Sequence, residues 1–94
     1  MLVMNIMTWE PDKRDEVLKR TQMGVRVPEG VKMLGLWSDV SGCRAFFLID
    51  ATDKAAVDPK AILEGWWRPW GDLCKLERCW VIETEELMKL LPKG

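Results

Sequence analysis

Few residues in this chain could take part in chemistry, because its 94 residues include no His and no Tyr. Asn5 lies within an apolar segment, where its amide could polarise a ligand carbonyl or bond a neighbouring side chain or water. Arg44 could hold a carboxylate or enolate through two parallel hydrogen bonds, or could pair with Asp50 or Glu77. Any general base would be a carboxylate, Lys or Cys with a shifted pKa, so no catalytic residue is assigned.

Tryptophan is the second conspicuous feature, with six indoles in the chain. Trp66, Trp67 and Trp70 form a dense cluster with the intervening Arg and Pro. The cluster could wall a pocket for a planar ligand, or pack in the core or in an oligomer interface. A candidate ligand-binding site is assigned to six residues: Asn5, Trp9, Trp37, Arg44, Trp66 and Trp80.

The cysteines do not indicate a metal site. Cys43, Cys74 and Cys79 are three in number, and no two are spaced as Cys-x-x-Cys. Without His, a four-ligand zinc site would need a carboxylate, which is unusual for structural zinc. We interpret the three cysteines as small buried residues of strands. An axial His for heme and a Gly-rich phosphate loop for flavin are both missing, so we predict no metal and no cofactor.

The charge pattern argues against two classes of partner. Fourteen basic and fifteen acidic residues are mixed along the chain and give a net charge of −1. No basic arm is present to neutralise a phosphate backbone, so nucleic acid is not an expected partner. The apolar stretches are shorter than the ~18 residues that span a bilayer, so no membrane partner is expected. The opening residues 1–9 lack a basic leader and a small-residue cleavage site, which favours a cytoplasmic location.

The elements that must position these residues have the order β-α-β-β-α-β. Strands are expected over residues 2–9, 31–38, 43–50 and 73–83. Helices are expected from Pro11 to Gly24, from Pro59 to just before Pro69, and over a short segment from Thr84. This order predicts a single α+β domain over residues 1–94, of the ferredoxin-like type, with an antiparallel sheet of order 4-1-3-2. Glu77 and Arg78 then lie on an edge strand, where charges commonly discourage edge-to-edge pairing.

Both faces of the predicted sheet are apolar. Alternate residues of a strand point to opposite faces. In the first strand, the set of alternate residues that includes Val3 and the set that includes Met4 are both mainly hydrophobic. The same holds in the third strand for the sets that include Phe46 and Phe47. Two helices can cover only one face. Several hundred Å² of apolar surface in water would forgo on the order of 10 kcal/mol, which rivals the stability of a small domain. We therefore predict a homodimer packed sheet to sheet, or a higher oligomer built from it.

The element order and the two-faced sheet resemble the dimeric α+β barrel superfamily, which includes antibiotic-biosynthesis monooxygenases, chlorite dismutase-like proteins, stress-responsive barrel domains and ligand-binding domains of some transcriptional regulators. Residues 7–11, 27–32, 69–73 and 83–86 are similar to segments of a family of uncharacterised stand-alone domains of about this length. The resemblance covers nearly the whole chain. It implies a dimeric barrel and does not imply a chemistry.

Three functions are compatible with the sequence. The first is a non-catalytic domain that binds a small apolar or aromatic molecule. The second is a cofactor-independent monooxygenase or isomerase, in which the substrate supplies the reactivity while Asn5, Arg44 or a Trp encloses and polarises it. The third is a structural assembly domain. A cavity lined by these side chains would favour the first two, whereas a filled core would favour the third, and whether the protein is an enzyme stays open.

Overall fold

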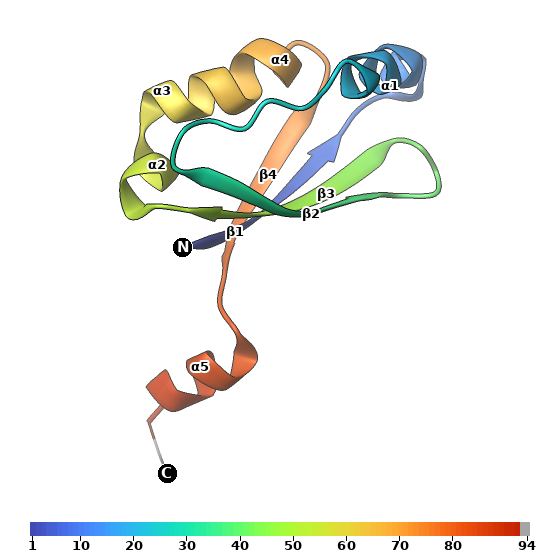
Figure 1. Cartoon of the computed structure of the whole chain (residues 1–94). Coiled ribbons are helices and arrows are strands. Elements are labelled where there is room, and N and C mark those ends of the chain that lie inside the picture. The colour runs from blue at the N-terminus through green and yellow to red at the C-terminus, as the bar shows by residue number, and fades with distance from the viewer. Residues whose placement is uncertain (93–94) are drawn as a thin grey trace.

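The computed structural model describes residues 1–92 and consists of a four-stranded sheet with helices packed on one face (Figure 1). The elements in chain order are β1 (Leu2–Thr8), η1 (Pro11–Lys13), α1 (Arg14–Gln22), β2 (Val31–Ser38), β3 (Arg44–Ala51), α2 (Asp53–Val57), α3 (Pro59–Ile62), η2 (Leu63–Trp67), α4 (Arg68–Trp70), β4 (Lys75–Val81) and α5 (Thr84–Leu90). This arrangement confirms the predicted α+β class with a ferredoxin-like order of elements and an additional C-terminal helix.

The sheet is antiparallel throughout, with the strand order β2-β3-β1-β4. Counted from the β4 edge, the same order is 4-1-3-2. The central strand β1 pairs on one side with β3 and on the other with β4, so that Asn5 lies between Phe47 and Arg78. Residues paired in this way point to the same face of a sheet. Asn5, Phe47 and Arg78 therefore share one face.

The helical layer is formed by two stretches. The first is the turn η1 followed by α1, and it ends close to Gly24, whose φ of 107° is a conformation suited to glycine. The second runs from α3 through η2 to α4, and the side chain of Asp58 caps it by accepting from the Lys60 amide at 3.0 Å.

The predicted end of the second stretch before Pro69 is wrong, because the helical path continues to Trp70. Pro69 lies in the first turn of α4, directly after the wide π turn of η2. The helical backbone is continuous here, since Trp67 and Arg68 keep helical φ and ψ and the amide of Arg68 donates to the carbonyl oxygen of Leu63. Pro69 therefore removes one hydrogen bond from the ladder, at a point that the π turn already makes irregular.

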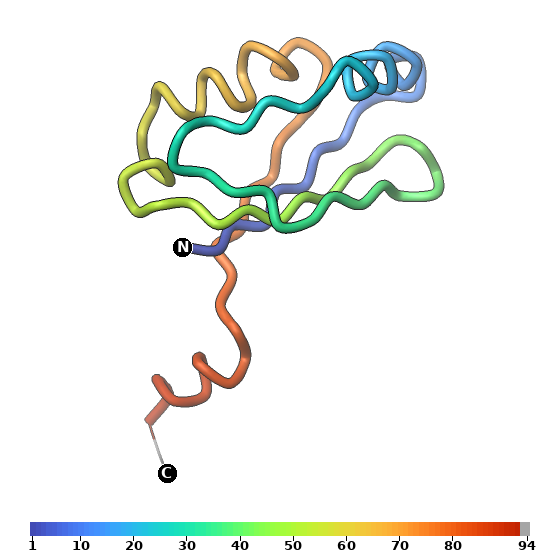
Figure 2. Tube along the Cα trace, viewed as in Figure 1, coloured from blue at the N-terminus to red at the C-terminus, as the bar shows by residue number. Residues whose placement is uncertain are grey.

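The helices cover one face of the sheet only. In Figures 1 and 2, α1 to α4 and the segment 23–30 lie on the same side, whereas α5 lies on the other. The side chains of Val3, Asn5 and Met7 point to the covered side and are buried. The opposite side, here called the open face, carries apolar side chains that are half-buried or exposed: Leu2, Met4, Ile6, Trp37, Phe46 and Leu48.

The C-terminal helix α5 projects from the body of the domain. Every residue from Ile82 to Pro92 is exposed, including the apolar Leu87, Leu90 and Leu91. The Cα radius of gyration is 15.0 Å, larger than the roughly 12 Å that is typical of a compact domain of this length. The structure therefore leaves two apolar surfaces uncovered, the open face and α5.

Candidate functional site

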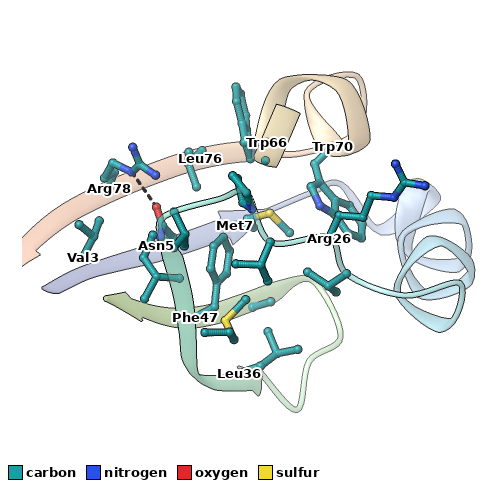
Figure 3. A pocket seen from close by; sticks show the side chains of 18 of the residues that line it. Val3, Asn5, Met7, Arg26, Leu36, Phe47, Trp66, Trp70, Leu76 and Arg78 are labelled. Carbon is teal, nitrogen blue, oxygen red and sulfur yellow. Dashed lines mark hydrogen bonds between the residues drawn. The ribbon is translucent and has the colours of Figure 1, made fainter. Parts of the chain in front are cut away.

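A cavity of about 140 Å³ lies between the covered face of the sheet and the helical layer (Figure 3). Its walls are mostly aliphatic and aromatic, with contributions from all four strands, α1, the segment 23–30 and the second helical stretch. The side chains most relevant here are Asn5, Met7, Phe47, Trp66, Trp70 and Arg78. An engineered apolar cavity of roughly 150 Å³ binds benzene. The volume therefore suits a ligand with about one aromatic ring.

Local sequence explains how the roof of the cavity forms. Trp66 and Trp70 are four residues apart, which places both indoles on the sheet-facing side of the second helical stretch. Gly65 lets the segment 23–30 approach this stretch closely, because a Cβ at that position would lie 2.8 Å from Cγ of Pro28. The π turn, the indoles and the glycine together hold the segment and the helices over the sheet.

Asn5 and Arg78 form the polar part of the cavity wall. Asn5 is fully buried, and its Oδ1 accepts a hydrogen bond from Nε of Arg78 at 2.9 Å. A guanidinium has only donors, so this bond fixes the amide with its oxygen toward Arg78. The amide nitrogen Nδ2 is then left without a hydrogen-bond partner. Burial lowers the pKa of Arg78, although arginine keeps its charge at physiological pH.

Trp66 provides a second unpartnered donor in the same wall. In residues 1–92, the buried side-chain nitrogen and oxygen atoms without a hydrogen-bond partner are Nδ2 of Asn5 and Nε1 of Trp66. By contrast, Nε1 of Trp9 donates to the carbonyl oxygen of Gly42 at 3.0 Å. A buried donor left unpaired costs about 1–3 kcal/mol. An acceptor atom of a ligand in the cavity could relieve that cost.

The structure brings together four of the six residues assigned from the sequence. Asn5, Trp9 and Trp66 line the cavity, and Arg44 borders it from the exposed first position of β3. Asp50, a proposed partner of Arg44, instead accepts from the N-terminal ammonium group at 3.1 Å.

Trp37 and Trp80 lie elsewhere. Trp37 is 52% exposed on the open face, where its ring lies directly over Gly35. Trp80 is 68% exposed on the edge strand β4. Neither indole lines the cavity. Trp37 points to the open face, whereas Trp80 pairs with Val3 and so shares the covered face, on the outermost strand of the sheet.

Sequence reasoning missed Arg78. Its position on an edge strand suggested a charge that prevents edge-to-edge pairing, whereas the structure turns its side chain toward Asn5 at the cavity. The register of β1 and β4 places the two residues directly opposite each other, and no local pattern of the sequence specifies that register.

One end of the cavity wall is fastened by an ion pair. Arg20 of α1 donates two hydrogen bonds to the carboxylate of Asp72, at 2.8 and 2.9 Å, and a third to the carbonyl oxygen of Pro69 at 2.9 Å. The bidentate contact with Arg20 holds the pKa of Asp72 below its usual range. These bonds tie α1 to the helix that carries Trp70.

The described residues contain no group of three or more His, Cys, Asp or Glu side chains placed to hold a metal ion. Cys74 is buried, and burial raises the pKa of its thiol to about 11. Cys43 is half-buried and Cys79 is exposed, and only Cys79 lies within a strand, so the interpretation of all three cysteines as buried residues of strands is wrong.

Fold and site define an α+β structure of ferredoxin-like arrangement with an apolar cavity under its helices. The chain belongs to the family described as a domain of unknown function (DUF3303), whose model matches residues 1–94. No curated protein and no solved structure matches it. From residue 1 to residue 92, no helix is both long enough and apolar enough to cross a bilayer.

Proposed function

We propose that this domain binds a small apolar or aromatic molecule in the cavity between sheet and helices, and that it does so as a homodimer. The observation that carries the binding proposal is an apolar cavity of about 140 Å³ with the fully buried amide of Asn5 in its wall. A bound ligand would remove the apolar side chains of the wall from water, which favours binding.

Binding is favoured over catalysis by the chemistry of the wall. The described lining residues include no carboxylate, Lys or Cys, and the chain has no His or Tyr, so a general base is lacking at the cavity. The cavity also argues against the purely structural alternative, which fits a filled core better. The cofactor-independent enzyme remains the alternative that a turnover assay with a phenolic or enolisable substrate would support.

The homodimer is proposed because the open face and α5 are both apolar and uncovered. Leu87 and Leu90 lie three residues apart, which places them along one side of α5, and the exposed Leu91 follows directly as its C-cap residue. This helix extends away from its own sheet on the side of the open face (Figure 1). A second copy packed sheet to sheet, as in a dimeric α+β barrel, would cover the open face and give α5 a surface to contact. Interfaces of this kind bury roughly 1,600 Å² or more.

The binding proposal is tested by a thermal-shift screen with single-ring aromatic compounds, read in parallel by Trp fluorescence. A ligand that binds only the native state raises Tm, and the indoles of Trp66 and Trp70 report its presence. Ala61→Leu should fill the cavity and abolish both signals, whereas Val57→Leu adds bulk at an exposed position outside it. The proposal fails if no compound shifts Tm, or if Ala61→Leu binds as well as the native protein.

The homodimer is tested by sedimentation at low micromolar concentration. We expect the native chain to sediment as a dimer and Leu48→Glu, on the open face, to sediment as a monomer because a carboxylate would be buried against the partner. Lys60→Glu, on the exposed surface of the helical layer, is the control. A monomeric native chain would disprove the dimer without touching the binding proposal.

A further inference from the structure

The charged residues around the cavity all have the same sign. Among the described lining residues, Arg26, Arg44 and Arg78 are charged and none is acidic, although the chain contains fifteen Asp and Glu. Arg26 and Arg44 are exposed at the periphery, and Arg44 pairs with Thr8, on the same side of the sheet as Phe46. Arg78 differs, because its side chain is hydrogen-bonded to the buried amide of Asn5 in the wall itself. Figure 3 shows Arg78 beside Asn5 and Arg26 well away from them.

The charge of Arg78 is not neutralised by the protein. In residues 1–92 it takes part in no ion pair, and its side chain donates to the neutral oxygen of Asn5. The neighbouring Glu77 pairs with Ile6 and so points to the open face, away from the cavity. A cation that borders an apolar space without a carboxylate partner is a suitable contact for an anionic ligand.

The unpartnered polar atoms of the wall also favour a ligand that accepts hydrogen bonds, as an anion does. Nδ2 of Asn5 and Nε1 of Trp66 are both donors, and both are buried without an acceptor. A carboxylate offers two oxygens that only accept, with about four lone-pair positions. An alcohol or a primary amide would bring donors of its own into a wall that already has an excess of them.

We propose that the ligand is a small aromatic carboxylate, with its ring in the apolar part of the cavity and its carboxylate at Arg78 and Asn5. This inference rests on the proposed binding function and deepens it. The ring would lie among Met7, Phe47 and Trp70, and the volume of about 140 Å³ limits it to about one ring. Arg78 is an exposed residue as a whole, so the carboxylate can keep part of its hydration.

The test compares benzoate, benzamide and toluene as probes of the full chain at neutral pH, where benzoate is ionised. The three have nearly the same shape and differ in the charge and polarity of one substituent. Hydrogen bonds to a charged group are stronger than those between neutral groups, so benzoate should bind about tenfold more tightly than benzamide in a Trp-fluorescence titration. Added salt should weaken benzoate binding and leave toluene binding unchanged.

Two variants locate the effect. Arg78→Met keeps an unbranched apolar stem and removes the guanidinium and its charge, so the preference for benzoate over benzamide should disappear while toluene still binds. Arg68→Met removes an exposed cation that does not line the cavity and should leave all three affinities unchanged.

Each result is decisive. If benzamide or toluene binds the unmodified protein as tightly as benzoate, or if Arg78→Met keeps the preference, the carboxylate inference is overturned and the binding function stands. If none of the three probes binds, the binding function fails together with it. Should Arg78→Met not fold, the comparison of probes on the unmodified chain still decides between these results.

Discussion

Replacing Asn5 by Leu tests whether the buried amide serves ligand binding or the stability of the fold. In the structure the amide makes one hydrogen bond, from Nε of Arg78, while its nitrogen has no partner. Leu has the same branched arrangement of four side-chain heavy atoms but no polar atom, so the substitution removes the bonded acceptor and the unpaired donor together and adds some bulk beside the cavity.

The expected change in the free energy of unfolding is small because the contributions oppose each other. Loss of a hydrogen bond to a charged group costs about 1.5–3 kcal/mol, but Arg78 is an exposed residue and water can replace the lost acceptor. Removal of a buried unpaired donor returns about 1–3 kcal/mol, and Leu adds apolar contacts. We expect Asn5→Leu to unfold within about 1 kcal/mol of the native protein, which corresponds to a shift in Tm of no more than about 4–8 °C.

Urea denaturation of both proteins at one protein concentration measures this difference, and a benzoate titration of the same samples measures binding. Stability should be retained while benzoate binding is lost. A loss of more than about 3 kcal/mol would mean that Asn5 is a structural residue and would refute the reasoning. Asn5→Ala is the control, because it leaves a cavity and should destabilise the fold even though it removes the same polar atoms.

Three further predictions concern the surroundings of the site. Gly71→Ala should lower Tm and weaken ligand binding, because its Cβ would lie 2.6 Å from the backbone oxygen of Trp67 and would displace the end of α4. Asp72→Asn should make the fall in Tm between about pH 6 and about pH 2 less steep than in the native protein. The ionised Asp72, whose pKa is lowered by Arg20, stabilises the fold above the ordinary carboxyl pKa, and this contribution is lost as the pH falls through the lowered pKa. At about pH 8, iodoacetamide should modify the exposed Cys79 before the buried Cys74, whose pKa is raised to about 11, and peptide mass spectrometry would detect the reverse order.

Local patterns in the sequence predicted the order of the elements and the apolar character of both sheet faces. Proline and acidic residues marked the helix starts at Pro11 and Asp58, and glycine marked the end at Gly24. These signals depend on a few neighbouring residues, so they can be found without knowing the tertiary structure. The failure at Pro69 has the same origin, because a proline usually ends a helix, whereas here it follows a π turn in which the hydrogen-bond ladder is already irregular.

The composition of the candidate site could be predicted only in part. The burial of Asn5 could be inferred from its apolar neighbours, but its bond to Arg78 depends on the register between residues that are 73 positions apart. Trp37 lies outside the site because its face of the sheet is not covered, whereas Trp80 shares the covered face with Val3 but stays exposed on the edge strand. Register and choice of face are set by packing of the whole domain, so no local pattern contained them.

The π turn of η2 also affects how the chain can vary in length. A π turn accommodates one residue more than an α turn. Loss of one residue within Leu63–Trp67 would therefore restore a regular helix and leave the flanking α3 and α4 in phase, whereas a deletion inside α3 would rotate the downstream helical residues by about 100°. Because Trp66 lies in this turn, chains shorter by one residue here would keep the fold and present a different wall to the ligand.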